Sequence, residues 1–257
     1  MSRILSIFNQ KGGVGKTTTV INLASYLSHY GNDVLIVDMD PQANATGGLG
    51  IRNKNDLRNT IYEALMGDQL INKCLYRTEF ENLSLLPANI NLAGAEIEMS
   101  RMINRDYLLR DILDEIKEDY DFILIDCPPS LNVLTINSLA ASDGVIIPIQ
   151  SEYYALEGVS ELLNTCKLVQ KRINPELAID GILMTMCDKR TNLSKLVEDD
   201  VRAYFKDKVY KTVIPRNIRL AEAPSYGKPI LEYNPNSSGA IAYKMLAKEI
   251  IKGGSDE

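Results

Sequence analysis

Short apolar runs alternate with longer stretches of helical periodicity along most of the chain. Six of the short runs are predicted strands, and several are continuous in Ile, Leu and Val, which is typical of strands buried on both faces of a parallel sheet. These strands are Arg3–Phe8, Val34–Asp38, Leu83–Leu86, Phe122–Asp126, Val145–Ile149 and Ile179–Thr185. The predicted helices are Thr17–Tyr30, Asp106–Tyr120, Ala155–Arg172, Leu193–Phe205 and Ser238–Lys252.

This alternation predicts an α/β fold with a doubly wound, mostly parallel sheet flanked by helices. No linker, repeat or low-complexity tract interrupts the pattern. We therefore expect a single domain over residues 1–252, followed by a disordered tail over residues 253–257.

Three of the predicted strands end in residues that suggest chemistry. Phe8 leads into a glycine-rich loop, while two other strands end at Asp38 and Asp126. In open parallel sheets the ligand site lies beyond the carboxyl ends of the strands. We expect the three strand ends to converge on one site.

The glycine-rich loop follows a strand and opens a helix, which is the context of a phosphate-binding loop. Glycines let consecutive backbone N–H groups surround phosphate oxygens, and the helix N-terminus adds partial positive charge. Lys16 can reach the β- and γ-phosphates, and the Thr17 hydroxyl is placed to bind Mg²⁺. The strict GxxxxGK[ST] pattern is not met, because Gln10 occupies its first glycine position. The loop predicts ATP and Mg²⁺ as ligands and consists of Lys11, Gly12, Gly13, Val14, Gly15, Lys16, Thr17 and Thr18.

Lys11 is unusual, because a second cation near the same phosphates would repel Lys16. The arrangement is reasonable if Lys11 neutralises charge that develops during phosphoryl transfer. Lys11 could do so from a neighbouring subunit, in the manner of an arginine finger supplied in trans. A solvent-facing lysine is the alternative.

Three aspartates are candidates for the acidic side of the site. An unpaired Asp126 at the end of a buried strand would be costly, and a Mg²⁺ ion would compensate its charge. Asp40, before Pro41, could orient the attacking water, and Asp38 could hold a metal-bound water. Either Asp40 or Asp38 could instead cap a loop.

The net charge of −6 argues against a nucleic-acid partner, but its distribution is uneven. The segment between Thr185 and Lys228 contains ten Lys and Arg residues and six Asp and Glu residues. This local excess of positive charge suits either a nucleic-acid surface or ordinary solvated helix faces. The four cysteines form no CxxC pair and are expected to be free, buried and structural. No segment has the length of a membrane span or the pattern of a signal peptide, so we expect a cytoplasmic protein.

The loop Lys11–Thr18 resembles the deviant Walker A motif of the ParA/MinD group of P-loop ATPases. The segments Asp38–Asn44 and Ile125–Ser130 resemble the further nucleotide motifs of that group. The likeness continues at Leu92–Glu96 and in three later segments: Glu152–Gly158, Arg190–Leu193 and Val213–Pro229. It covers nearly the whole chain and indicates chromosomal ParA proteins of the Soj type.

This resemblance implies a P-loop NTPase fold and a weak, Mg²⁺-dependent ATPase for DNA segregation. Lys11 would contact nucleotide across an ATP-sandwich homodimer, and Asp40 would activate water. Pro215 and Asn217 match adenine contacts. Arg190 matches a family arginine that contacts nonspecific double-stranded DNA, and Arg219 is expected as the second contact in preference to Lys189.

The expected partner is a ParB-type centromere-binding protein that stimulates hydrolysis, and the expected location is the nucleoid. Because the chain starts directly with its first strand, we expect it to lack the N-terminal DNA-reading domain of some plasmid ParA proteins and not to bind a specific operator. Its end lacks the basic amphipathic helix with which MinD proteins bind membranes, so no stable membrane binding is expected. A MinD-like regulator of division-site placement is the alternative. A metabolic ligase or iron–sulfur ATPase is a weaker one, because Cys127 has no suitably placed second cysteine.

Overall fold

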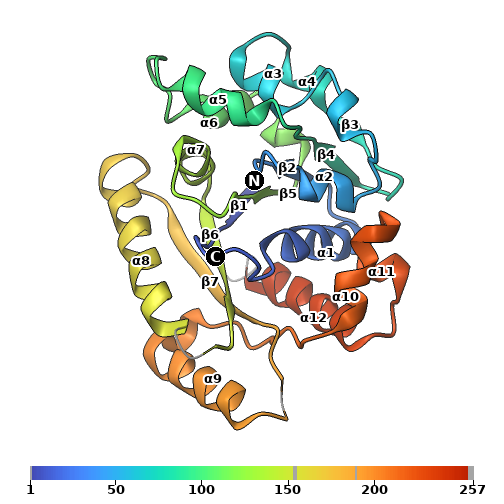
Figure 1. Ribbon diagram of the computed structural model, residues 1–257, viewed down its shortest axis with the longest axis vertical. Helices are drawn as coiled ribbons and strands as arrows, with labels where there is room; N and C mark the ends of the chain where they lie inside the picture. Colours follow the sequence, from blue (N-terminus) through green and yellow to red (C-terminus); the bar gives the residue numbers. More distant parts are fainter. Residues whose placement is uncertain (1, 153–154, 189, 254–257) are drawn as a thin grey trace.

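The computed structural model describes residues 2–152, 155–188 and 190–253. A seven-stranded sheet has the order β3-β4-β2-β5-β1-β6-β7 and runs through the middle of the molecule (Figure 1). Its strands pair in parallel except β3, which is antiparallel to β4. The strands are β1 (Arg3–Ile7), β2 (Val34–Asp38), β3 (Tyr76–Arg77), β4 (Leu83–Leu86), β5 (Phe122–Asp126), β6 (Gly144–Gln150) and β7 (Ala178–Thr185).

Helices cover both faces of the sheet, as expected for a doubly wound fold (Figure 1). One face carries α1 (Lys16–His29), α2 (Asn44–Gly48), α10 (Ile218–Glu222), α11 (Ile230–Tyr233) and α12 (Ser238–Gly253). The other face carries α3 (Ile61–Met66), α4 (Ile71–Cys74), α5 (Leu92–Met99), α6 (Leu108–Leu113), α7 (Val133–Ala140), α8 (Ala155–Arg172) and α9 (Asn192–Phe205).

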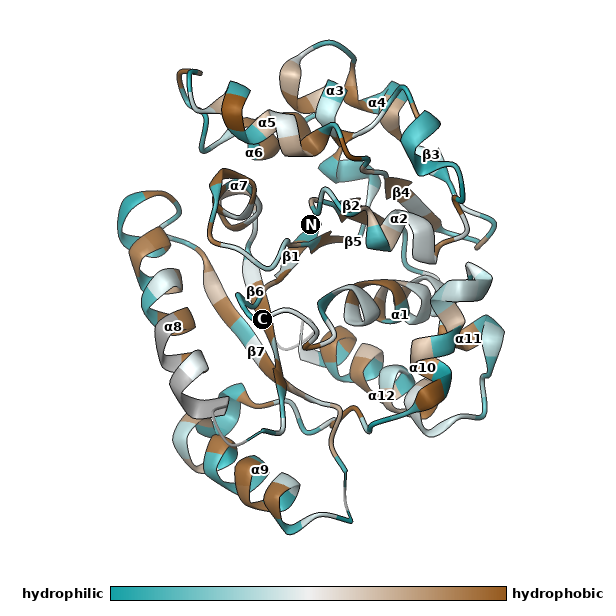
Figure 2. Cartoon of the chain, viewed as in Figure 1, coloured by the Kyte–Doolittle hydropathy of each residue, from teal (hydrophilic) through white to brown (hydrophobic). Residues whose placement is uncertain are grey.

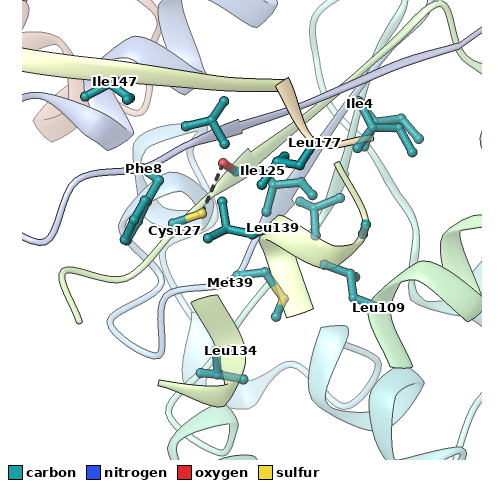
Figure 3. Packing of buried hydrophobic residues seen from close by; sticks show 14 of the residues in the cluster. Ile4, Phe8, Met39, Leu109, Ile125, Cys127, Leu134, Leu139, Ile147 and Leu177 are labelled. Carbon is teal, nitrogen blue, oxygen red and sulfur yellow. Dashed lines mark hydrogen bonds between the residues drawn. The ribbon is translucent and has the colours of Figure 1, made fainter. Parts of the chain in front are cut away.

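Each face of the sheet has its own hydrophobic core. Side chains of successive strand residues point to opposite faces, so Ile123 and Ile125 of β5 pack into one cluster and Leu124 into the other. Figure 3 shows the first cluster, where Phe8 and Cys127 lie together with Ile125. The strands are coloured mostly as hydrophobic, while the surrounding helices carry both kinds of residue (Figure 2). Strands buried on both faces explain the continuous apolar runs in the sequence.

Most long elements agree with the sequence predictions. The strands at β2, β4 and β5 and the helix α8 have the predicted bounds, and β1, β6, β7, α1 and α9 differ by one or two residues. The predicted helix Asp106–Tyr120 is wrong as a single element, because α6 ends at Leu113 and a separate 3₁₀ turn covers Lys117–Asp119. A helix that ran to Tyr120 would place the acidic side chains of Glu118 and Asp119 in its last turn, at the negative end of its dipole.

The chain end also differs from its prediction. Helix α12 includes Gly253, so the predicted tail does not begin at that residue, and residues 254–257 lie outside the described residues. The four cysteines are buried, as predicted. Within the described ranges, none of the helices combines the length and the apolar character needed to cross a membrane.

Candidate functional site

The glycine-rich loop connects β1 to α1 at the carboxyl edge of the sheet. Gly13 and Gly15 have φ angles of 76° and 93°, in the left-handed region that favours glycine. A Cβ atom on Gly12 or Gly13 would meet nothing within 4 Å, so open space lies beside the loop. Since α1 lacks a side-chain cap at its N-terminus, its first N–H groups remain available to an anion.

The two lysines of the loop have different surroundings. Lys16 is 7% exposed, and its ammonium donates to the carbonyl oxygen of Lys11 at 3.0 Å. Burial lowers the pKa of Lys16, and the charge of Asp126 opposes that effect. The ammonium of Lys11 forms an ion pair with the Glu152 carboxylate at the surface. Lys16 therefore lies in the site, whereas Lys11 lies along its rim.

Asp126 lies at the meeting point of three strand ends. Strand β5 runs between β1 and β2, with Asp126 beside both Ile7 and Asp38 in the register. The predicted convergence of the three strand ends is thus confirmed.

The Asp126 carboxylate is fully buried, and neither oxygen has a hydrogen-bond partner among the described residues. Burial raises the pKa of Asp126 well above its usual value, and the charge of Asp38 adds to the rise. The Thr17 hydroxyl and the Lys16 ammonium oppose it. An orphaned carboxylate beside a hydroxyl suits a hard divalent cation, so the residues present fit Mg²⁺.

Asp38, the last residue of β2, and Asp40, in the loop that follows, have different hydrogen-bond partners. Both oxygens of Asp38 already have partners: one accepts from the Asp40 N–H at 3.2 Å, the other from the Thr46 N–H and hydroxyl at 2.8 and 2.7 Å. Burial raises the pKa of Asp38 to about 6, and the Thr46 hydrogen bonds limit the rise. Asp40 accepts from the Gln42 N–H at 2.9 Å and lines the cavity in front of the glycine loop.

Two adjoining cavities extend from the glycine loop. One, of about 470 Å³, is lined by the loop and by Asp40. The other, of about 430 Å³, is mostly apolar and is lined by Pro215, Asn217 and Tyr243 among others. Both cavities share Gly15, Thr18 and Met186. A polar cavity beside an apolar one matches the phosphate and ring portions of a nucleotide.

Comparisons with known proteins place the chain among its relatives. A family model described as an AAA domain matches residues 2–179. The chain is 56% identical over 254 residues to the sporulation initiation inhibitor protein Soj of Bacillus subtilis (strain 168), covering 99% of this chain and 100% of that protein. It is 51% identical over 252 residues to the chromosome partitioning protein ParA of Myxococcus xanthus (strain DK1622), covering 98% and 89% respectively.

The chain belongs to the ParA/Soj family. It is a chromosome-partitioning ATPase of the P-loop class, in agreement with the resemblance of its motifs. Its fold is also similar to a solved structure of cobyrinic acid a,c-diamide synthase from Mycobacterium smegmatis with bound ADP and magnesium. The TM-score is 0.87 at 39% identity, over 99% of this chain and 96% of that one.

The remaining predicted site residues of this ParA/Soj protein lie outside the phosphate loop. Asn217 caps α10 by accepting from the Arg219 N–H at 2.8 Å, and its amide donates to the Ser238 hydroxyl at 2.7 Å. Arg190 lies just before α9 and donates to both carboxylate oxygens of Asp188. The two predicted DNA contacts, Arg190 and Arg219, thus come from separate elements of the fold.

Sequence reasoning missed Met186, which lines both cavities of the ParA/Soj site. Its φ angle of 52° is uncommon for a residue other than glycine, and such backbone is frequent at binding sites. Met186 directly follows β7, so its position after a strand end was the available signal. Tyr243, from α12, could not be found in that way, because it reaches the cavity from the far end of the sequence.

Proposed function

We propose that this ParA/Soj protein binds ATP and Mg²⁺ at the glycine loop and hydrolyses ATP slowly as a DNA-bound homodimer. The main support is the pair of adjoining cavities, one beside the loop of Lys11–Thr18 and one lined by Pro215 and Asn217. The triphosphate occupies the first cavity and the adenine the second. ADP and magnesium in the M. smegmatis relative support the choice of ligands.

Mg²⁺ would be held by the Thr17 hydroxyl and by Asp126, whose oxygens have no other partner among the described residues. The ion supplies charge neutralisation at the phosphates. Asp38 adds negative charge beside Asp126, while its own oxygens hold Thr46. Lys16, which is nearly buried, binds the β- and γ-phosphate oxygens.

Asp40 orients the attacking water. Its carboxylate lines the cavity in front of the loop and is held by the Gln42 N–H. Lys54 donates to the carbonyl oxygens of Gln42 and Ala43, so the segment after Asp40 is fixed at both ends. A fixed carboxylate facing the phosphates is what water orientation requires.

Two subunits associate because Lys11 of each completes the nucleotide site of the other. Lys11 is 56% exposed, so it is accessible to a second copy. The dimer doubles the Arg190 and Arg219 contacts and therefore binds DNA more tightly than the monomer, without reading sequence. A ParB-type partner then stimulates hydrolysis, and the dimer leaves the nucleoid. The MinD-like alternative has less support, since two relatives at more than half identity are a Soj protein and a ParA protein.

The proposal is tested by measuring DNA binding of the full chain with ATP and magnesium at low and high salt. We expect binding that requires ATP and weakens steeply with salt, because phosphate contacts release counterions. Arg190→Ala should weaken binding at every DNA sequence to the same degree.

Two variants separate the steps of the cycle. Asp40→Ala should bind ATP, dimerise and remain on DNA, whereas Lys11→Ala should bind nucleotide as a monomer in gel filtration. A wild-type chain that stays monomeric when saturated with magnesium and a non-hydrolysable ATP analogue would refute the proposed cycle.

A further inference from the structure

A further cleft, separate from the two nucleotide cavities, lies on the side of the molecule away from α8 and α9. It has a volume of about 290 Å³ and is formed by β3 and two loops, one after α2 and one before α11. Figure 1 shows β3, α2 and α11 on this side of the molecule. None of its lining residues belongs to the two nucleotide cavities.

Three cations converge on this cleft from three separate segments: Arg52, Arg77 and Lys228. All three are exposed, and in the part of the chain that the structure describes none of their side chains has an ion pair or hydrogen bond. One carboxylate, Glu79, also lines the cleft. The cleft therefore carries three cations against one carboxylate, and this excess of positive charge favours an external anion.

Two tyrosines give the cleft an aromatic wall, Tyr76 at 38% exposure and Tyr226 at 61%. The ring of Tyr226 stacks on that of Tyr233 with 4.9 Å between centroids. The Tyr233 hydroxyl donates at 3.0 Å to Glu222, which also accepts from Arg219 at 2.8 Å. The exposed Tyr226 ring is thus held in place by Tyr233, which is itself held by Glu222 and, through Glu222, linked to Arg219.

The two loops of the cleft touch through glycines. Gly50 and Gly227 have φ angles of 95° and 67°, and a Cβ atom on Gly227 would lie 2.6 Å from the Cα of Gly50. This backbone contact fixes the segment of Arg52 against the segment of Lys228. The third cation, Arg77, lies on β3 and is positioned by the pairing of β3 with β4.

We propose that Arg52, Arg77 and Lys228 form a binding site for a phosphate-bearing ligand that carries a ring. Arginine matches phosphate oxygens with paired N–H donors, and an exposed tyrosine stacks on a base or packs on a sugar. The cleft is at the small end of ligand sites, so it holds about one nucleotide unit. The unit comes either from the DNA backbone, a case that rests on the proposed function, or from a free nucleotide.

The test compares the double variant R52A/R77A with R58A/R101A, which removes two exposed arginines outside the cleft. Each full chain is saturated with magnesium and a non-hydrolysable ATP analogue. Binding of a short fluorescent DNA duplex is followed by anisotropy over a range of salt. Binding of inorganic pyrophosphate to the same proteins is followed by calorimetry.

If the ligand is DNA, R52A/R77A should weaken duplex binding by about tenfold and lower the salt dependence by about two ions, with little change in R58A/R101A. If the ligand is a free nucleotide, only pyrophosphate binding should be lost, and only in R52A/R77A. The proposed site would be overturned if duplex binding weakened equally in both double variants. It would also be overturned if R52A/R77A changed neither pyrophosphate binding nor duplex binding. If the wild type binds no duplex, the proposed function fails, and the loss or retention of pyrophosphate binding in R52A/R77A alone tests the proposed site.

Discussion

The ammonium of Lys11 forms an ion pair with the carboxylate of Glu152 of the same subunit, at the rim of the phosphate loop. The two side chains are 56% and 49% exposed, so the pair is screened by water. In the proposed dimer Lys11 serves the other subunit, and it must first leave Glu152.

Glu152→Gln should therefore strengthen dimerisation with magnesium and a non-hydrolysable ATP analogue. The expected gain is up to about fivefold, the scale of an exposed ion pair. Sedimentation of the dimer gives the measurement. Asp114→Asn is the matched control, since it removes the similarly exposed pair with Lys117 and should leave dimerisation unchanged. Weaker dimerisation of Glu152→Gln would mean that Glu152 acts in the dimer itself.

Asp126→Asn should stabilise the nucleotide-free protein while abolishing the effect of magnesium. The pKa of Asp126 is higher in the folded protein than in the unfolded chain, so the residue costs stability as the pH rises above about 4. Near pH 8 we expect a gain of about 1–3 kcal/mol in the free energy of unfolding, and near pH 4 almost none.

Urea unfolding measures this gain, and a thermal shift with ATP, with and without magnesium, measures the lost metal response. Asp180→Asn is the contrasting variant, because Asp180 has partners in Arg3 and Tyr210. It should destabilise the protein. A loss of stability in Asp126→Asn as well would show that the carboxylate is satisfied in the folded state.

Thr46→Val should destabilise the protein more at high pH than at low pH. The Thr46 hydroxyl donates to Asp38 at 2.7 Å and accepts from the Ala88 N–H at 3.0 Å. Burial raises the pKa of Asp38 to about 6 and the hydrogen bond from Thr46 limits that rise, so removing the hydroxyl raises the pKa of Asp38 further. The added cost is absent where Asp38 is protonated in both folded proteins, below about pH 6, and it is complete above the raised pKa of the variant.

We expect a loss of about 1 kcal/mol near pH 4 and about 3 kcal/mol near pH 8, measured by urea unfolding. Thr19→Val is the control, since its buried hydroxyl pairs with Tyr243 at 3.1 Å. Burial raises the pKa of Tyr243 far above this range, so the loss in Thr19→Val should not change with pH. A pH-independent loss in Thr46→Val would exclude Asp38 as the titrating group.

The sequence was sufficient to predict a structural element where many residues repeat one pattern, and to predict a site where one motif holds several functional groups. The buried strands at β2 and β5 show as continuous apolar runs, and the loop Lys11–Thr18 lies in one segment. Short elements such as α2 and β3 were missed, because five or two residues are too few to show a period.

Sites assembled from segments far apart in the chain could not be predicted from the sequence either. Arg52, Arg77 and Lys228 are far apart in the sequence and meet only through the pairing of β3 with β4 and the contact of Gly50 with Gly227. Likewise, the orphaned state of Asp126 became visible only when its neighbours were placed.

Asp188→Asn should strengthen DNA binding in the ATP-bound state. Asp188 accepts hydrogen bonds from the Arg190 guanidinium at 2.9 and 2.7 Å, and these hold the pKa of Asp188 well below its usual value. The carboxylate therefore stays ionised and neutralises Arg190 at the surface proposed for DNA. Removing its charge should raise affinity by a few fold and the salt dependence by about one ion.

Anisotropy of a labelled duplex at several salt concentrations measures both quantities. Asp199→Asn removes an exposed carboxylate of α9 that has no ion pair among the described residues, and it should change affinity less. Equal gains in the two variants would assign the effect to net charge rather than to release of Arg190.

Gly227→Ala should destabilise the protein far more than Gly67→Ala, although both glycines have left-handed backbone, with φ angles of 67° and 77°. A Cβ atom on Gly67 meets nothing within 4 Å, so that variant loses about 1 kcal/mol from backbone strain alone. A Cβ atom on Gly227 lies 2.6 Å from the Cα of Gly50, and a backbone atom cannot rotate away. The loops must separate, which should cost about 2–3 kcal/mol more. Urea unfolding of the two variants gives the comparison, and equal losses would show that the contact between the loops yields without cost.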